Sequence, residues 1–243
     1  MMGFSNVYED ANRAEAYSKL EFPGTYYLAY RDLPTIIRKL VNGRKAIDFG
    51  CGAGRSTRFL QELGFDAVGV DISSGMIDRA KAQDQSGDYY LIANGDFSQF
   101  EGGVYDLVLS VFTFDNIPTV DQKVRNFVGL RRLMKPDGRF VSVVSSPEIY
   151  THEWASFSTK DFRENWRAKS GDKVRIIQTD IEDKRPVVDV VCSDKSYRSI
   201  YRKSSLFVVR TYRPLAKESE PFEWVNETRI PPWVIYVLAK KCE

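Results

Sequence analysis

The chain has 243 residues, of which 43% are hydrophobic and 28% charged, which is typical of one globular α/β domain rather than of a disordered or fibrous chain. Its 35 basic and 33 acidic side chains leave a formal net charge of only +2. Nucleic-acid-binding domains usually carry a basic excess or a dense stripe of Lys and Arg. The charge therefore argues against a nucleic-acid partner.

Cysteine usage and the N-terminal sequence indicate the compartment. Cys51, Cys192 and Cys242 are odd in number and far apart, which argues against a disulfide framework and has no metal-ligand spacing. The first residues lack the basic and then apolar pattern of a signal peptide. No apolar run approaches the roughly 20 residues that span a bilayer. We therefore expect a cytoplasmic protein with no membrane partner and no metal.

Hydrophobic periodicity gives the predicted elements in chain order. Helices are expected over Tyr8–Leu20 and Tyr26–Leu40, with a break at Phe22-Pro23-Gly24. Short apolar runs then alternate with amphipathic segments. The predicted strands are Lys45–Phe49, Ala67–Asp71, Tyr89–Asn94, Tyr105–Val111 and Arg139–Ser145, and the predicted helices between them are Ser56–Leu63, Ser73–Gln83 and Asp121–Met134. This alternation predicts a doubly wound, mostly parallel sheet with helices on both faces.

The pattern changes at Pro147. Two β-rich runs, Val174–Thr179 and Val187–Val191, follow an aromatic stretch and predict a small antiparallel insert over the sheet. A helix over Ser196–Ser204 and strands over Leu206–Tyr212 and Trp233–Leu238 complete the chain.

The strongest local signal is a glycine-rich loop after the first predicted strand. The sequence Asp48-Phe49-Gly50-Cys51-Gly52-Ala53-Gly54 opens the next predicted helix. Glycine allows a sharp turn and a close approach to a ligand, and a helix start offers free N–H groups. Asp71 ends the second strand, where a carboxylate can accept hydrogen bonds from ribose hydroxyls. These features predict a nucleoside site at the carboxyl ends of the strands.

The loop chemistry favours a cationic nucleoside. Dinucleotide binders use G-x-G-x-x-G, but Arg55 stands where the third glycine is required. Asp48 is a poor neighbour for a pyrophosphate and a suitable one for a cation. S-adenosylmethionine carries a sulfonium, an ammonium and no phosphate, so it fits better than NAD.

Five segments in order resemble the class I S-adenosylmethionine-dependent methyltransferases, small-molecule type. They are Asp48–Gly54, Val70-Asp71-Ile72-Ser73 with Met76, Asn94–Phe97, Tyr105–Val108 and Leu133–Gly138. The resemblance covers roughly residues 44–145. It implies a seven-stranded sheet in the order 3-2-1-4-5-7-6, with only the last strand antiparallel.

The resemblance also implies roles for individual residues. The methionyl part of the cofactor would lie against Gly50 and Gly52, with Asp48 and Cys51 in the same loop and Cys51 as a small packing residue. Asp71 would bind the ribose. The remaining cofactor contacts would be Ile72 and Met76 on the adenine, Asp96 on its amino group, Phe97 beside the ring and Ser110 near the methionine portion. Asp96 has a second reading, because it could simply cap the turn before Phe97.

Candidates outside the loop are less determined. Tyr8 and Tyr17 precede the core, where similar methyltransferases close a helix over the cofactor; packing of that helix on the sheet is an equal alternative. Phe112 and Asn116 follow the fourth strand and are candidates for acceptor binding. His152, the only histidine, is a weak candidate for a general base or substrate contact, against the simpler reading of a surface-loop residue. The catalytic residues are otherwise unknown.

The expected function is transfer of a methyl group from S-adenosylmethionine to N or O of a small-molecule acceptor, leaving S-adenosylhomocysteine. A non-catalytic S-adenosylmethionine-binding module and, less favoured, an NAD-dependent oxidoreductase are the alternatives. We expect a single domain, in which residues 1–42 form a helical lid, 43–146 the cofactor-binding core, 147–195 a substrate-side insert and 196–243 the end of the sheet. The sequence does not determine the acceptor or the oligomeric state.

Overall fold

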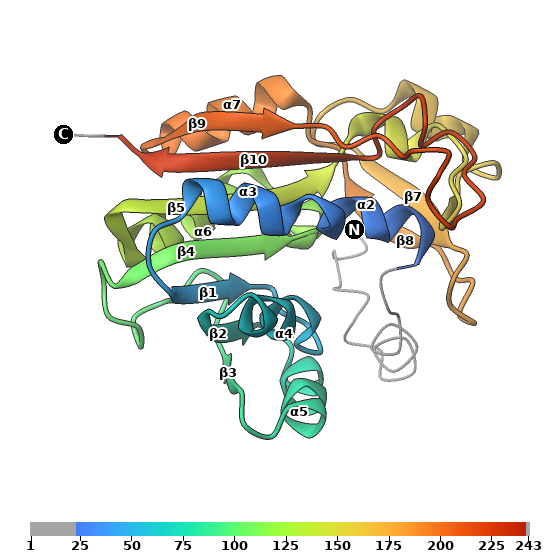
Figure 1. Cartoon of the computed structure of the whole chain (residues 1–243). Coiled ribbons are helices and arrows are strands. Elements are labelled where there is room, and N and C mark those ends of the chain that lie inside the picture. Colours follow the sequence, from blue (N-terminus) through green and yellow to red (C-terminus); the bar gives the residue numbers. More distant parts are fainter. Residues whose placement is uncertain (1–22, 242–243) are drawn as a thin grey trace.

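The computed structural model describes residues 23–241 and contains one seven-stranded sheet (Figure 1). Its strand order is β3-β2-β1-β4-β5-β10-β9. Five strands carry the parallel core: β1 (Lys45–Phe49), β2 (Asp66–Asp71), β3 (Asp88–Leu91), β4 (Tyr105–Val111) and β5 (Met134–Ser145). The last strand, β10 (Trp233–Lys240), is antiparallel to both β5 and β9 (Leu206–Tyr212). In chain order this is 3-2-1-4-5-7-6, so the predicted topology is confirmed.

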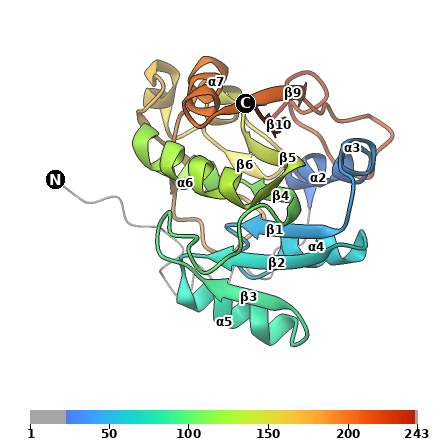
Figure 2. The same ribbon diagram turned by 90° about the vertical axis from the view of Figure 1, so that its left-hand side faces the viewer.

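Helices cover both faces of the sheet (Figure 2). They are α2 (Gly24–Arg31), α3 (Leu33–Leu40), α4 (Arg55–Glu62), α5 (Ser74–Gln83), α6 (Val120–Leu133) and α7 (Asp194–Lys203). Leu109 and Val111 of β4 pack in a cluster with α2 and α3, whereas Val108 packs in a separate cluster with α6 and α7. The alternation follows from the two-residue period of a strand, and both faces of β4 are buried.

The N-terminal helix differs from its prediction. A single helix over Tyr26–Leu40 is wrong, because the chain forms α2 and α3 with a break at Asp32. Pro34 lies in the first turn of α3, where its missing N–H costs nothing, but the same ring would clash inside a continuous helix. The two helices lie along the sheet and extend beyond its edge to the insert (Figure 1).

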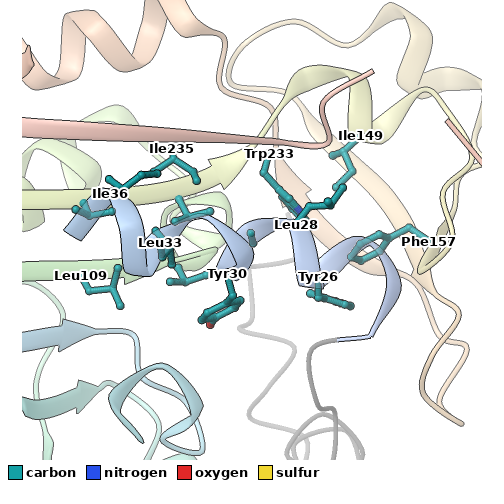
Figure 3. Packing of buried hydrophobic residues seen from close by; sticks show 14 of the residues in the cluster. Tyr26, Leu28, Tyr30, Leu33, Ile36, Leu109, Ile149, Phe157, Trp233 and Ile235 are labelled. Carbon is teal, nitrogen blue, oxygen red and sulfur yellow. The ribbon is translucent and has the colours of Figure 1, made fainter. Parts of the chain in front are cut away.

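The packing of α2 joins the sheet to the insert (Figure 3). Leu33 and Ile36 of α3 lie against Leu109 and Ile235 of the sheet, and Tyr26 of α2 points toward Phe157. The rings of Tyr26 and Phe157 are 4.8 Å apart between centroids. Therefore α2 fixes the position of the insert relative to the sheet.

The insert contains a second, three-stranded antiparallel sheet at the carboxyl ends of the parallel strands. Its order is β6 (Phe157–Ser158), β7 (Lys173–Gln178) and β8 (Val187–Val190). The predicted antiparallel piece is confirmed for β7 and β8. Strand β6 was not predicted, because two residues are too few for an alternating pattern.

Candidate active site

The glycine loop adopts left-handed backbone at each of its three glycines. The φ angles are +75° at Gly50, +53° at Gly52 and +85° at Gly54. A Cβ on Gly50 would lie 2.1 Å from Oγ1 of Thr113, whereas a Cβ on Gly52 would enter open space. The loop thus requires glycine for two different reasons: Gly50 lacks room beside the end of β4, and Gly52 opens toward a potential ligand.

Asp48 is fully buried beneath the loop. Its Oδ2 accepts hydrogen bonds from Ser56 Oγ at 2.6 Å and from Thr57 Oγ1 at 2.7 Å. Its Oδ1 has no hydrogen-bond partner among the described residues. Burial raises the pKa of Asp48 to about 6, against the two hydroxyl hydrogen bonds that lower it. The carboxyl group is therefore poised to respond to a nearby cation.

Asp71 ends β2 and is tied to the glycine loop. Its Oδ2 accepts from the backbone N–H of Gly52 and its Oδ1 from that of Ser73, both at 2.9 Å. Burial raises the pKa of Asp71, while these amide hydrogen bonds oppose the rise. A carboxylate has about four acceptor positions, so Asp71 can hold the loop and still accept from a ligand.

A first hollow of about 420 Å³, partly open to solvent, lies over the glycine loop. Its wall consists of Tyr30, Gly50, Cys51, Gly52, Ala53, Arg55, Ser56, Arg58, Val111 and Phe112. Arg55 and Arg58 bring positive charge to this wall, which suits a carboxylate. The carboxylates of Asp48 and Asp71 lie beneath and beside the loop and are not part of the wall.

The other predicted cofactor residues follow β2 and β3. Ile72 is 46% exposed directly after Asp71, and Met76 is buried on α5. Asp96 is exposed, and its Oδ1 accepts from the N–H of Ser98 at 2.9 Å, the geometry of the turn-capping alternative. Phe97 is buried, with its ring 5.7 Å from that of Phe49. The structure brings these residues to the carboxyl ends of the strands.

Ser110 lies away from the hollow. It shares the α6 face of β4 with Val108, is fully buried and does not line either hollow. Val111, on the opposite face, lines the first hollow instead. The expectation that the Ser110 side chain faces the cofactor is therefore not met, because successive strand residues point to opposite faces.

A second hollow, of about 400 Å³, lies between α2, the insert and β10. Its wall consists of Tyr26, Phe112, Asp115, Asn116, Ser145, Ile149, Tyr150, Phe157, Ile176, Gln178, Val187, Asp189 and Trp233. Two of the predicted acceptor residues, Phe112 and Asn116, are among them. These two residues are also hydrogen-bonded to each other, since Asn116 Nδ2 donates to the backbone carbonyl of Phe112 at 3.3 Å.

Phe112 belongs to both hollows. Its φ is +64°, a left-handed conformation that a bulky residue rarely adopts. Its ring is 4.4 Å from that of Trp233 and 5.8 Å from that of Tyr26, measured between centroids. Strain of this kind is retained only where the surroundings fix it. Phe112 is thus a fixed side chain that borders both hollows.

A buried polar cluster lies under the second hollow, around the 3-10 turn η2 (Thr113–Asn116). Asp115 accepts from the N–H of Ser145 at 2.9 Å and from the hydroxyl of Tyr197 at 3.1 Å. Lys123 of α6 donates to the carbonyl of Phe114 and is buried beside Asp115. Burial raises the pKa of Asp115 and lowers that of Lys123, and their mutual attraction opposes both shifts.

His152 lies outside both hollows. Its Nδ1 is 3.1 Å from the carbonyl of Glu148, and its ring is 5.6 Å from that of Trp166. Trp166 is 66% exposed. This position on the outer surface of the insert matches the simpler reading of His152 as a loop residue, and not a role at the acceptor.

Sequence reasoning missed several residues of the second hollow. Tyr26, Tyr150, Gln178, Asp189 and Trp233 come from five elements that are far apart in the chain. For Gln178 a signal existed, because it continues the buried alternation of Val174 and Ile176 on β7. This alternation places a polar side chain on the apolar face of the strand. No signal of this kind marked Tyr150 or Asp189.

Some predictions fall outside the described residues, and others find no opposing feature. Tyr8, Tyr17 and Cys242 lie outside residues 23–241. Within that range no group of three or more His, Cys, Asp or Glu side chains could hold a metal ion. Also within it, none of the helices has the length and apolar character needed to cross a membrane.

The cofactor implied by the sequence resemblance fits the first hollow. Asp48 Oδ1 is a buried acceptor without a partner in the described chain, which suits a neighbouring cation. The open space at Gly52 permits close approach of a ligand to the backbone. Arg55 and Arg58 suit a carboxylate in the same molecule.

Comparison with known proteins agrees with this geometry. Residues 47–142 match the family described as "Methyltransferase domain". The ubiquinone biosynthesis O-methyltransferase of Methylococcus capsulatus is 26% identical over 152 residues, which are 53% of this chain and 63% of that protein. The 18S rRNA (guanine-N(7))-methyltransferase of Bos taurus is 37% identical over 65 residues, which are 27% of this chain and 23% of that protein. The chain thus spans less than two thirds of either relative.

Solved structures share the whole fold. A SAM-dependent methyltransferase from Methanosarcina mazei superposes with a TM-score of 0.63 at 14% identity, over 86% of this chain and 98% of that one. At this identity the similarity demonstrates the fold. The match over residues 47–142, which hold the glycine loop and most of β1 to β5, identifies this part of the chain as a methyltransferase domain.

Proposed function

We propose that this chain transfers the methyl group of S-adenosylmethionine to a nitrogen or oxygen of a small-molecule acceptor by in-line displacement. The observation that carries the proposal is the pair of hollows that meet at Phe112. One lies on the glycine loop, and the other lies between α2, the insert and β10. An acceptor and a cofactor in these two hollows would meet beside Phe112.

The protein's contribution is mainly binding and orientation. S-adenosylmethionine, when bound, supplies a methyl carbon activated by a positive sulfur. Gly50 and Gly52 allow its approach to the loop, Asp48 offers negative charge and Asp71 offers acceptors for ribose hydroxyls. The aromatic walls of the second hollow exclude water and align the acceptor, which are the effects that accelerate a displacement between two bound reactants.

The second hollow favours an enzyme over a non-catalytic binding module, because a sensor of the cofactor needs only the first. The bovine rRNA methyltransferase aligns over only 27% of this chain, and the net charge of +2 is without the basic excess that is typical of RNA-binding domains. Arg55 in the loop argues against NAD.

The proposal also includes the domain division given above. Residues 1–42, with Tyr8 and Tyr17, and residues 147–195 would enclose the acceptor as a lid. Strands β7 and β8 at the carboxyl edge of the sheet support the second part of this lid. A cytoplasmic location belongs to the proposal as well, and subcellular fractionation of the source cells tests it.

Calorimetric titration tests the cofactor. We expect micromolar binding of S-adenosylmethionine, no heat with NAD, and loss of binding in Asp71→Ala. An acceptor screen that follows S-adenosylhomocysteine formation tests the transfer itself. Binding of NAD, or of neither cofactor, would overturn the proposal, and tight binding of S-adenosylmethionine with no transfer to any class of acceptor would favour the non-catalytic module.

A further inference from the structure

The charged side chains that line the second hollow are carboxylates. Asp115 and Asp189 contribute carboxylates and Gln178 a carbonyl oxygen. In the described part of the chain, the lining includes no Lys, Arg or His side chain. The hollow therefore presents negative charge and acceptor atoms to its occupant, and these suit a molecule that brings N–H donors.

Gln178 points to such a donor independently of the carboxylates. Its Nε2 donates to the hydroxyl of Tyr26 at 2.8 Å. Its Oε1 is buried and has no hydrogen-bond partner among the described residues. Gln178 is only 4% exposed and shares the hollow-lining face of β7 with Ile176. A buried acceptor without a partner costs free energy, so a donor from a ligand would relieve it.

Both carboxylates of the hollow are held in place by hydrogen bonds. Tyr197 donates to Asp115 and Tyr150 donates to Asp189. Lys123 attracts Asp115 and interacts more weakly with Asp189.

The remainder of the wall is aromatic. The rings of Tyr26, Phe112, Phe157 and Trp233 lie within 4.4 to 6.1 Å of one another in contacting pairs. Such a wall packs against a flat or alkyl body, and aromatic faces also attract cations. The hollow thus combines an apolar region with an acceptor-rich polar end.

We propose that the methyl acceptor is a primary or secondary amine on an apolar, preferably aromatic, body, whose N–H groups are held by Gln178 Oε1 and the carboxylates of Asp115 and Asp189. This inference rests on the proposed function and narrows it from nitrogen or oxygen to amine nitrogen. Phe112, three residues before Asp115, brings the polar end of the hollow next to the first hollow.

The reaction balances with these groups alone. The bound ammonium first gives a proton to the carboxylate of Asp115. The lone pair of the resulting amine forms the new C–N bond while the C–S bond of S-adenosylmethionine breaks, and the electron pair of that bond stays on sulfur, giving a neutral thioether. The methylated nitrogen keeps the positive charge, and the proton on Asp115 is lost to solvent when the product leaves. Burial raises the pKa of this carboxyl group, which favours its role as proton acceptor, and Lys123 and Tyr197 hold it in place.

The test uses matched pairs of amines and alcohols. Phenethylamine and tryptamine are compared with 2-phenylethanol and tryptophol, by calorimetric binding to the full chain saturated with S-adenosylhomocysteine. A parallel assay with S-adenosylmethionine detects methylated products by mass spectrometry. Hydrogen bonds to charged groups contribute roughly 1.5 to 3 kcal/mol, so we expect each amine to bind about ten-fold or more tightly than its alcohol.

Variants identify the groups responsible. Gln178→Leu removes the acceptor and Gln178→Glu keeps it, so the amine preference should fall at least about three-fold in the first variant and persist in the second. Asp115→Asn should retain amine binding more than amine methylation, and its methylation rate should lose the wild-type dependence on pH. Trp166→Phe, on the exposed surface of the insert, is the control. Unchanged binding of S-adenosylmethionine verifies that each variant is folded.

The outcomes separate the two proposals. If the wild-type protein did not bind S-adenosylmethionine, the proposed function itself would be overturned. Binding of the cofactor with methylation of the alcohols, or with no amine preference in either pair at millimolar concentrations, would overturn only the amine inference. Amine preference that Gln178→Leu leaves unchanged would also overturn it.

Discussion

Gly50 and Gly52 make different demands on the glycine loop, and alanine substitutions should separate them. Gly50→Ala adds a Cβ that meets three side-chain atoms of Thr113, at 2.1, 2.3 and 2.7 Å. Gly52→Ala adds a Cβ to open space in the first hollow. Both positions have left-handed φ angles, +75° and +53°. The backbone penalty is therefore shared, and the collision belongs to Gly50 alone.

The free energy of unfolding should report this difference. A non-glycine residue in left-handed backbone costs about 1 to 2 kcal/mol, and overpacking costs about 1 to 3 kcal/mol more. Gly50→Ala should therefore destabilise the protein by about 2 to 5 kcal/mol and Gly52→Ala by about 1 to 2 kcal/mol. Gly52→Ala should nevertheless lose more affinity for S-adenosylmethionine than Gly50→Ala does, because the Gly52 Cβ enters the space that we assign to this ligand.

Urea denaturation and calorimetric titration measure the two quantities, and a double-mutant cycle isolates the collision. Thr113→Gly removes all three atoms that the new Cβ would meet, at the cost of its hydrogen bond to the Phe49 carbonyl at 2.9 Å. In the Gly50→Ala background it should recover about 1 to 3 kcal/mol relative to additivity. Equal destabilisation by both alanines, or an additive cycle, would refute the reasoning. If Gly52→Ala kept the wild-type affinity for S-adenosylmethionine, this result would exclude contact between the ligand and position 52.

Three further predictions concern buried groups. Asp48 has an ordinary pKa of 3.8 and a folded pKa of about 6, so its ionisation opposes folding as pH rises through this window. Between pH 4 and 7, Asp48→Asn should therefore gain up to about 3 kcal/mol in free energy of unfolding relative to the wild type. Parallel curves of stability against pH for the two proteins would contradict this. Phe112→Gly should be about 1 to 2 kcal/mol more stable than Phe112→Ala, measured by urea denaturation, because both lose the ring and only glycine tolerates the φ of +64°; the opposite order would exclude strain. Lys123→Met should lower the free energy of unfolding by about 3 to 5 kcal/mol, because Asp115 loses its cation. Asp115→Asn in the same chain should recover part of this loss. If the effects of the two substitutions on the free energy of unfolding were purely additive, that would argue against the pairing.

The strands and helices of the parallel core could be predicted because their signals are local and repeated, whereas the strand order followed from the family resemblance. Each parallel strand appears as a short apolar run, and each is followed by a helical pattern or a turn. The glycine loop could also be predicted, since its residues are consecutive and its glycines indicate a left-handed backbone. The break at Asp32 was available in principle from Pro34, but apolar periodicity across residues 26–40 concealed it.

Ser110 illustrates where a local reading fails. The sequence places it at the end of β4 but does not tell which face of the sheet it joins. Neighbouring residues of a strand point to opposite faces, so an error of one position exchanges Ser110 for Val111. Because both faces of β4 are buried, hydrophobicity could not choose between them.

The second hollow could not be predicted as a whole, since its wall is built by tertiary packing. Tyr26, Tyr150, Gln178 and Trp233 meet only because α2 packs on both the sheet and the insert. The wall of the first hollow, in contrast, comes largely from the loop that joins β1 to α4 and from the first residues of α4. The two hollows should therefore respond differently to substitution. A change in the insert alters the shape and charge of the second hollow while the glycine loop keeps its contacts, so acceptor selectivity can change while affinity for the cofactor is preserved.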